Sequence, residues 1–275
     1  MTGFAPPPGG GAALVTGAAQ GIGLALATAL AADGWRVVLA DLDAAKAEAA
    51  AAALPGARAV RLDVTDPGAV DAVVTGIEQD EPLRLLVNNA GVSPAPGDRG
   101  LWSVTEWQRV VAVNLMGVVH GIGAAYPRMR DRGSGVILNT ASLAGLVPGP
   151  GLGPYGATKH AVVGLSLGLR ADAAPFGVRV SALCPGWVDT PMLDSVGPDG
   201  RPVRDDLAEF GIGEPVPAAD VAAAALDGLR RNVPLIVVPK EAKQAWWAQR
   251  LAPKYIERRS ARVAATIAAR TAVRR

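Results

Sequence analysis

The sequence predicts an α/β fold in which helices cover both faces of a mostly parallel β-sheet. Three observations predict it. Short β-branched segments alternate with longer helical segments from residue 12 to residue 239. The strand-like segments are continuous apolar runs, as expected for strands that are buried on both faces. A glycine-rich turn follows the first of these segments and leads directly into a helix.

Seven segments have the length and composition of strands, at 12–16, 36–40, 59–62, 83–88, 135–140, 179–183 and 235–238. Helical segments lie between them, at 22–32, 44–54, 67–79, 104–130, 155–174 and 218–230. Because strands and helices alternate, we expect right-handed crossovers between parallel strands.

The 275 residues suit one large domain with an appendage at each end. Residues 1–11 are predicted to form a flexible Pro/Gly arm, residues 12–240 the sheet-containing domain, and residues 241–275 a basic helical extension. Residues 187–213 contain four prolines and glycines in their middle and are too long for an ordinary connection. This stretch therefore predicts a mobile lid or substrate loop.

The composition is ordinary for a globular α/β enzyme, with 50% hydrophobic and 19% charged residues. Cys184 is the single cysteine, so an intrachain disulfide is excluded, and no Cys/His cluster predicts a metal site. The first eleven residues lack the basic and apolar regions of a secretory signal, and no segment offers about 18 continuous apolar residues. We therefore expect a cytoplasmic protein without a transmembrane segment.

The formal net charge of +2 conceals a strong asymmetry. Residues 240–275 carry ten Lys/Arg and two Asp/Glu, whereas the rest of the chain carries 17 basic and 23 acidic side chains. Such a tail can contact nucleic acid, anionic lipid or an acidic partner subunit. Ile256, Val263 and Ile267 recur in it at helical spacing. We expect this helix to dock on its own subunit or a partner, with weak membrane-surface contact as the alternative and no nucleic acid.

The turn at 16–23, with the sequence TGAAQGIG, predicts a dinucleotide-binding site. Its glycines permit a tight turn and close approach of the backbone to a pyrophosphate. The helix that follows directs its N–H groups and its positive dipole end at that anion. The expected cofactor contacts in this turn are Gly17, Gln20, Gly21, Ile22 and Gly23.

The ends of the second and third strands carry the residues expected around the adenosine. The carboxylate of Asp41 can accept hydrogen bonds from both ribose hydroxyls and would repel a 2′-phosphate. Gln20 and Leu42 supply no cation that could bind such a phosphate, so NAD is favoured over NADP as the cofactor. Asp63 can cap the adenine amino group, with Val64 beside it.

Tyr155 and Lys159 lie four residues apart at the start of a predicted helix, so their phenol and ammonium can converge. A phenol whose pKa is about 10 is a poor proton shuttle at neutral pH. A neighbouring ammonium and a positively charged nicotinamide would both lower that pKa. Ser142, at the end of the fifth strand, can orient a substrate carbonyl or alcohol. The three residues predict proton transfer at a substrate oxygen.

Five motifs in the same order resemble those of the short-chain dehydrogenase/reductase family in its NAD-type short form, over residues 12–240. They are Thr-Gly-x-x-x-Gly-x-Gly at 16–23, Asn-Asn-Ala-Gly at 88–91, the asparagine Asn114, the set Ser142, Tyr155 and Lys159, and Pro-Gly-Trp-Val-Asp-Thr at 185–190. The resemblance implies a Rossmann-type doubly wound sheet of seven strands in the order 3-2-1-4-5-6-7.

The resemblance also implies a role for each residue of the site. Tyr155 would be the general acid in reduction and the base in oxidation, and Lys159 would lower its pKa and bind the nicotinamide ribose. Ser142 would position the substrate oxygen, and Asn114 would support a water in the proton relay. Further cofactor contacts would come from Asn89, Ala90, Gly91, Pro185, Gly186, Val188 and Thr190.

The function expected from these residues is NAD-dependent interconversion of a secondary alcohol and a ketone. The apolar loop 143–154, together with Trp187, Met192 and Leu193, predicts a largely apolar substrate. Two alternatives stay open: a non-catalytic dinucleotide-sensing regulator, which would not need the proton relay, and a lyase or epimerase, whose chains are usually longer. Many family members end soon after the last strand, whereas this chain continues for 35 residues beyond Lys240. We expect a homodimer or homotetramer.

Overall fold

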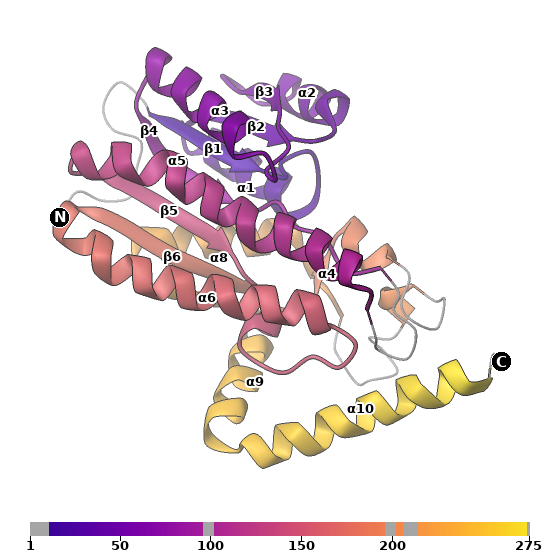
Figure 1. Cartoon of the computed structure of the whole chain (residues 1–275). Coiled ribbons are helices and arrows are strands. Elements are labelled where there is room, and N and C mark those ends of the chain that lie inside the picture. Colours follow the sequence, from indigo (N-terminus) through magenta and orange to yellow (C-terminus); the bar gives the residue numbers. More distant parts are fainter. Residues whose placement is uncertain (1–10, 96–101, 196–201, 206–213, 274–275) are drawn as a thin grey trace.

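The computed structural model describes residues 11–95, 102–195, 202–205 and 214–273 (Figure 1). The predicted arm at 1–11 lies almost entirely outside these residues. Of the predicted lid at 187–213, the residues 196–201 and 206–213 also lie outside them.

The centre of the fold is a parallel sheet of seven strands in the order β3-β2-β1-β4-β5-β6-β9. The predicted order is therefore confirmed, with β9 as the seventh strand. The strands are β1 (Ala12–Thr16), β2 (Arg36–Asp41), β3 (Arg58–Arg61), β4 (Leu83–Asn88), β5 (Gly135–Thr140), β6 (Val178–Pro185) and β9 (Leu235–Val238). Two further short strands, β7 (Val188–Asp189) and β8 (Val216–Pro217), pair with each other beside the sheet.

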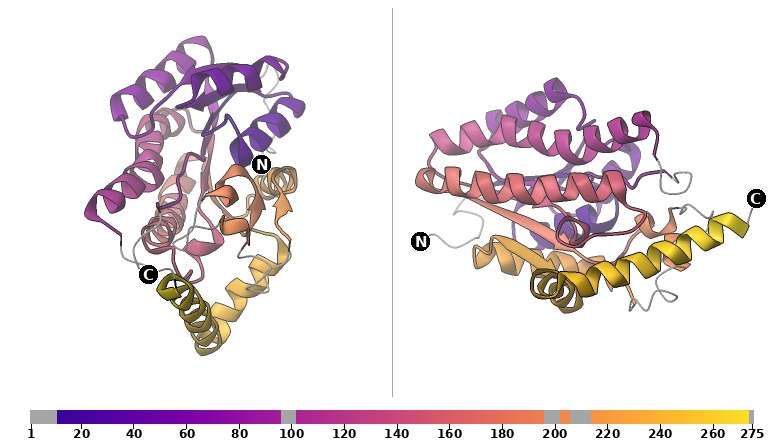
Figure 2. Two further views of the ribbon diagram at one scale, coloured as in Figure 1. Left: turned by 90° about the vertical axis from the view of Figure 1, so that its right-hand side faces the viewer. Right: turned by 60° about the horizontal axis from the view of Figure 1, so that its bottom comes forward.

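Helices cover both faces of the sheet (Figures 1 and 2). On one face lie α1 (Gly21–Ala32), α2 (Ala44–Ala52) and α8 (Ala218–Arg230), which pack on the sheet through one apolar cluster. On the other face, α3 (Pro67–Asp80), α5 (Gly117–Asp131) and α6 (Gly153–Ala173) enclose a second cluster. Strands such as β1 are buried along their whole length, which explains their continuous apolar sequence.

Local sequence signals fix where several helices begin. The carboxylates of Asp43 and Asp66 cap α2 and α3 by accepting from backbone N–H groups of the first turn. Ser103 caps α4 (Val104–Val111) in the same way. Helix α6 begins at Gly153, two residues before the predicted start, because Pro154 is tolerated in a first helical turn.

The predicted helix at 104–130 is one continuous helix with an irregular turn in its middle. Helix α4 passes into a π-helical turn, η1 (Ala112–Met116), and then into α5. By length and composition alone, this helix, Val104–Asp131, could cross a membrane. In the fold, its parts α4 and α5 pack on α6, α3 and the sheet.

Short 3-10 turns complete the chain at η2 (Leu143–Gly145), η3 (Ala174–Phe176) and η4 (Pro191–Asp194). After β9 the chain leaves the sheet and forms two helices, α9 (Lys240–Leu251) and α10 (Pro253–Val273). Figure 1 shows them as a bent arm below the body of the fold, with α10 running toward the end of the molecule where α4 begins.

Candidate active site

The glycine-rich turn lies at the carboxyl end of β1, between β1 and α1, where the order of the strands reverses. Gly17 and Gly21 have φ angles of +64° and +57°, which favour glycine. A Cβ on Gly23 would lie 2.1 Å from the Gly17 carbonyl oxygen, so the turn can close only with glycine there. Helix α1 has no side-chain cap at Gln20, which leaves its first N–H groups free of a side-chain partner. This is the arrangement that binds an anion at a helix N-terminus.

The segment after β4 holds this turn in place. The Asn89 side-chain amide donates to the carbonyl oxygens of Thr16 and Gly17, at 3.0 and 3.2 Å. The backbone N–H groups of Asn89 and Ala90 donate to the Thr16 hydroxyl, at 2.9 and 3.1 Å. The side chain of Asn89 thus lies beneath the glycine turn and shapes it.

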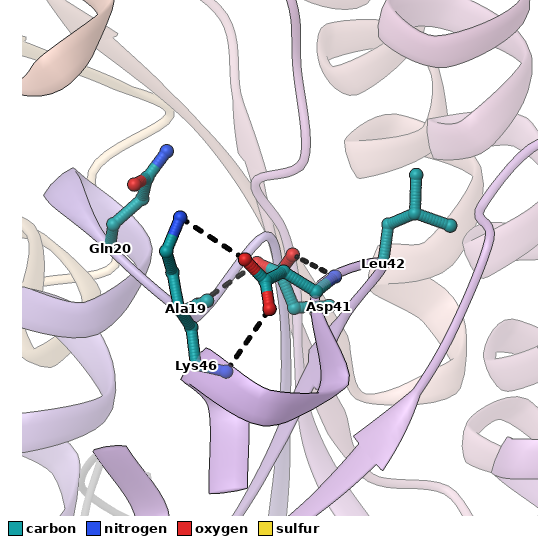
Figure 3. Close-up of a pocket in the computed structure, with 6 residues that line it drawn as sticks. Ala19, Gln20, Asp41, Leu42 and Lys46 are labelled. Carbon is teal, nitrogen blue, oxygen red and sulfur yellow. Dashed lines mark hydrogen bonds and ion pairs between the residues drawn. The ribbon is translucent and has the colours of Figure 1, made fainter. Parts of the chain in front are cut away.

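Asp41 ends β2 beside this turn and lines a pocket with an accessible volume of about 360 Å³. Its carboxylate accepts from the backbone N–H groups of Ala19 and Asp43, at 2.9 and 3.0 Å. These two bonds fix the carboxylate at the edge of the pocket (Figure 3). Leu42 also lines the pocket, and its side chain is exposed.

Lys46 is a cation in the same pocket that the sequence interpretation missed (Figure 3). Its ammonium lies 3.1 Å from a carboxylate oxygen of Asp43. The other Asp43 oxygen accepts from the backbone N–H of Lys46, also at 3.1 Å. The signal that could have found Lys46 is its place in the first turn of a helix that starts directly after β2.

The residues after β3 lie at the same edge of the sheet, where the parallel strands β1, β2 and β3 end. One oxygen of Asp63 accepts from the backbone N–H and the hydroxyl of Thr65, at 2.9 and 2.7 Å, and these hydrogen bonds lower the pKa of Asp63. Val64 is buried, and its carbonyl oxygen lies 2.9 Å from Nδ1 of His120 on α5. Asp63 is therefore held as a carboxylate with a fixed orientation.

The segment after β6 returns to the glycine turn. The backbone N–H of Gly186 donates to the Val238 carbonyl oxygen at 2.7 Å, next to Pro185 at the end of β6. Val188 is buried in β7. The Cγ2 of Thr190 lies 3.3 Å from the position that a Cβ on Gly21 would take. The structure therefore brings two predicted cofactor segments, 17–23 and 185–190, into contact.

Lys159 is the buried cation of the site, with a side chain that is 3% exposed. Its Nζ donates to the Thr140 carbonyl oxygen at 2.8 Å and lies 5.5 Å from the centre of the Tyr155 ring. Burial lowers the pKa of Lys159 from 10.5 to about 8. At neutral pH the ammonium is therefore still mostly protonated and lies beside the phenol.

Ser142 and Tyr155 meet at the same place. Burial raises the pKa of the Tyr155 phenol, and its side-chain hydrogen bond with Ser142 works in the opposite direction. The Ser142 hydroxyl also accepts from the backbone N–H of Ala144, at 3.1 Å, which fixes its position after β5. The arrangement can hold an oxygen atom between two hydroxyl groups with a cation close by.

Asn114 lies in the π-helical turn and is completely buried. Its Oδ1 accepts from the Val92 N–H at 2.8 Å, and its Nδ2 donates to the Val92 carbonyl oxygen at 2.9 Å. A Cβ on Gly91 would lie 3.3 Å from this Oδ1 and 3.5 Å from the Lys159 Nζ. Asn114, Gly91 and Lys159 are thus immediate neighbours. Such π turns are frequent at functional sites.

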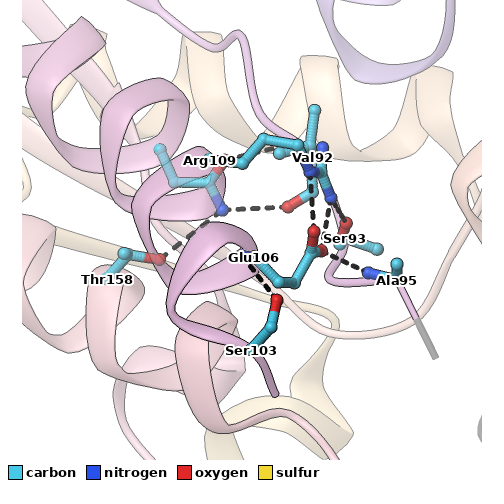
Figure 4. Close-up of polar contacts among 8 residues, drawn as sticks. Val92, Ser93, Ala95, Ser103, Glu106, Arg109 and Thr158 are labelled. Atoms are coloured by element: carbon cyan, nitrogen blue, oxygen red, sulfur yellow. Dashed lines mark hydrogen bonds and ion pairs between the residues drawn. The ribbon is translucent and has the colours of Figure 1, made fainter. Parts of the chain in front are cut away.

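Further residues that the sequence interpretation did not single out support this cluster (Figure 4). The Thr158 hydroxyl lies 3.5 Å from the Asn114 Nδ2 and donates to the Tyr155 carbonyl oxygen at 2.8 Å. Arg109 donates to the Ser93 carbonyl oxygen at 2.7 Å and pairs with Glu106, which accepts from the Ala95 N–H. These bonds tie the segment after β4 to α4.

Cys184 is a buried neighbour of the same site. Burial raises the pKa of its thiol to about 12, so the thiol is neutral at physiological pH. Among the described residues, no group of three or more His, Cys, Asp or Glu side chains is placed to hold a metal ion.

Comparison with known proteins gives consistent matches. The family described as short chain dehydrogenase matches residues 11–200. The chain is 42% identical over 195 residues to the 3-alpha-(or 20-beta)-hydroxysteroid dehydrogenase of Mycobacterium tuberculosis strain H37Rv, covering 69% of this chain and 74% of that protein.

Solved structures with the same fold include one relative in complex with NAD and another in complex with NADPH. A short chain dehydrogenase/reductase from Burkholderia phymatum in complex with NAD is 31% identical, with a TM-score of 0.79 over 94% of this chain and 96% of that chain. A short-chain dehydrogenase from Sphingobium yanoikuyae in complex with NADPH is 28% identical, with a TM-score of 0.73 over 90% and 94% of the two chains.

Proposed function

Because the chain belongs to the short-chain dehydrogenase/reductase family of oxidoreductases, we propose that it interconverts a secondary alcohol and a ketone with NAD as the cofactor. The observation that carries this proposal is the buried Lys159 ammonium beside the Tyr155 phenol, with Ser142 hydrogen-bonded to the phenol. A dinucleotide sensor would have no need for that arrangement.

The residues present fit a nicotinamide dinucleotide. The uncapped start of α1 and the positive-φ glycines fit its pyrophosphate, and Asp41 fits the adenosine ribose. Asp63 and Val64 would lie at the adenine of the cofactor. Ala90 and Gly91 would lie along the middle of the cofactor, and Val188 and Thr190 at its carboxamide. When bound, the cofactor would supply or accept the hydride.

The protein's own part in the reaction is proton transfer and orientation. In reduction, Ser142 and Tyr155 would hold the substrate oxygen by hydrogen bonds, and Tyr155 would donate its proton to it. In oxidation, the phenolate would take the proton back. The adjacent Lys159 cation would favour that phenolate, in opposition to the burial that raises the pKa of Tyr155. Asn114 would act as a positioning residue, through the segment that it holds beside Lys159.

The preference for NAD over NADP rests on Asp41. A 2′-phosphate would meet a carboxylate that two backbone N–H groups already hold in place. Lys46 would offer little compensation because its ammonium is paired with Asp43. Asp41→Ser is expected to lower the ratio of kcat/KM with NADH to that with NADPH by at least about tenfold, since a charged hydrogen bond contributes ~1.5–3 kcal/mol. Asp66→Ser, which changes the capping carboxylate before α3, serves as the control and should leave the ratio unchanged.

The substrate class that we propose is a largely apolar ketone or secondary alcohol. The loop 143–154 between β5 and α6 is rich in Leu, Val, Gly and Pro. A relative at 42% identity acts on hydroxysteroids, according to its name. Strong turnover of small charged oxoacids with none on apolar ketones would contradict this substrate class.

The experiment that tests the reaction is a panel of alcohols and ketones followed by nicotinamide absorbance. We expect wild type and Tyr255→Phe, which removes an exposed phenol from α10, to turn over the same panel members. Tyr155→Phe should lose turnover by at least about a hundredfold. Full activity of Tyr155→Phe would refute the mechanism, and inactivity of wild type on every member would favour the sensor.

We also propose that two copies associate through the face formed by α4, η1, α5 and α6. Large apolar side chains on these helices are exposed in the single chain: Trp107, Met116, Val119 and Leu167. The combined change Met116→Glu and Leu167→Glu is expected to give a monomer by light scattering. An unchanged dimer mass would place the interface elsewhere.

A further inference from the structure

We propose that the basic arm, defined as α9 and α10 (residues 240–273), binds the surface of an anionic lipid bilayer. The proposal concerns the exposed side of the arm and does not depend on the reaction. It begins from the charge asymmetry of the chain, because ten of the 27 Lys/Arg residues lie in the last 36 positions together with two acidic residues.

One side of the arm is already occupied by the protein itself. Ile256 is 5% exposed, and Val263 and Ile267 are half-buried. The Ile267 Cδ1 reaches within 3.9 Å of the position that a Cβ on Gly151 would take, in the loop before α6. These side chains recur at helical spacing, so they lie on one face of α10. The apolar face of α10 formed by Ile256, Val263 and Ile267 therefore packs against the body of the same chain.

The contact between the arm and the body does not bury the cations of the arm. Lys240, Lys243, Arg250, Lys254, Arg258, Arg259 and Arg262 are all exposed. Within the described part of the chain, none of these seven side chains forms an ion pair with a carboxylate. By contrast, several exposed arginines of the body, among them Arg204 and Arg230, have acidic partners. The cations of the arm are therefore available to an external anion.

Large apolar side chains are exposed where α9 meets α10. Trp247 is 46% exposed, Leu251 is 78% exposed and Tyr255 is 61% exposed. Trp247 and Leu251 are four residues apart and share one side of α9, and Tyr255 follows in the first turn of α10. The exposed Lys243 and Arg250 lie on the same side of α9 as this pair. Figure 1 shows this elbow as the part of the molecule that projects farthest below the sheet.

A bilayer surface can accommodate both the exposed apolar side chains and the cations where α9 meets α10. Trp and Tyr rings and a Leu side chain enter the boundary between headgroups and acyl chains, while Lys and Arg pair with anionic headgroups. A nucleic acid or an acidic protein loop would neutralise the cations and leave Leu251 in water. The rest of the chain carries an excess of acidic side chains. An anionic surface would repel the body and attract the arm, which fixes the orientation of the molecule.

The test is flotation of the full-length protein with vesicles of phosphatidylcholine alone or of equal parts phosphatidylcholine and phosphatidylglycerol. We expect binding to the anionic vesicles only, and its loss when the salt is raised from about 0.1 M to about 1 M. Trp247→Ser combined with Leu251→Ser should weaken partitioning at least about tenfold. Phe176→Ser, which changes an equally exposed aromatic residue on η3 (46%), should leave it unchanged.

A second pair of variants separates the position of the charges from their number. Arg258→Gln, Arg259→Gln and Arg262→Gln together should weaken binding at least about tenfold. The control variant combines Arg58→Gln, Arg61→Gln and Arg231→Gln. It removes the same charge from outside the arm and should bind as wild type does. Circular dichroism of each variant checks that α9 and α10 stay folded.

Three results would overturn the proposal. The first is equal recovery with neutral and anionic vesicles. The second is equal weakening by the arm triple and the control triple, which would show a general charge effect. The third is binding to RNA or polyglutamate as tight as to anionic vesicles and insensitive to Trp247→Ser with Leu251→Ser, which would identify a polyanion as the partner.

Discussion

Lys159 makes the stability of this fold depend on pH in a calculable way. Its side chain is 3% exposed, and burial lowers its pKa from 10.5 to about 8. Well below pH 8 the lysine is protonated in both the folded and the unfolded chain, and the full cost of the buried charge is present. Between pH 8 and pH 10.5 the unfolded chain binds more protons than the folded chain, so the free energy of unfolding rises with pH.

The size of the effect follows from the two pKa values. A pKa shift of one unit corresponds to ~1.4 kcal/mol, so the depressed pKa of Lys159 amounts to about 3 kcal/mol in total. Integrating proton binding from pH 8 to about pH 9.5 gives a gain of about 1.6 kcal/mol for the folded state. Other groups titrate in the same window, so the gain has to be measured against a variant that lacks this lysine.

The assay is urea unfolding of the cofactor-free protein at both pH values, for wild type, Lys159→Met and Lys243→Met. The methionine at 159 keeps most of the side-chain volume and removes the ionisable group. We expect the stability of wild type relative to Lys159→Met to increase by about 1.6 kcal/mol from pH 8 to about pH 9.5. Lys243 is exposed, so wild type and Lys243→Met should change in parallel. If Lys159→Met also changes in parallel with wild type, Lys159 is not a buried cation and the reasoning is refuted.

Two further predictions concern buried polar groups. Asn139 accepts from the Asn88 side-chain amide at 2.9 Å and donates to the Ser166 hydroxyl at 3.0 Å, so Asn139→Ala should lower the free energy of unfolding by about 2–4 kcal/mol in urea melts. A loss no larger than that of the exposed control Thr28→Ala would contradict it. Burial raises the pKa of the Cys184 thiol to about 12, so iodoacetamide at pH 8 should label this cysteine in urea and leave it unmodified in the native protein, as mass spectrometry would show. Rapid native labelling would mean that the thiol is accessible.

The parts of the site that the sequence predicted are those with a short-range pattern. The glycine turn, the carboxylate of Asp41 and the spacing of Tyr155 and Lys159 each lie within one local element. The strand order was predicted through the family resemblance. The structure confirms that order, and it places Ser142, Tyr155 and Lys159 together.

The parts that were missed depend on contacts between distant segments. Thr158 contributes through Asn114, which is 44 positions away in the sequence. Cys184 approaches Lys159 because α6 packs on β6. Asn89 was expected to contact the cofactor, and the hydrogen bond of its side chain to Gly17, 72 positions away in the sequence, was not foreseen. Lys46 was overlooked although it lies close in sequence, because only the capping geometry of Asp43 brings it into the pocket.

In the proposed reaction, Tyr155 transfers the proton while the surrounding residues only bind and orient. The most direct measurement is single-turnover reduction of an active ketone by saturating NADH, with wild type and Tyr155→Phe, together with the NADH Kd of each. We expect the rate of Tyr155→Phe to be at least about a hundredfold below that of wild type, while the NADH Kd changes less than about threefold. A variant that reduces the ketone at the wild-type rate, or that loses activity only because it no longer binds NADH, would contradict proton transfer by Tyr155.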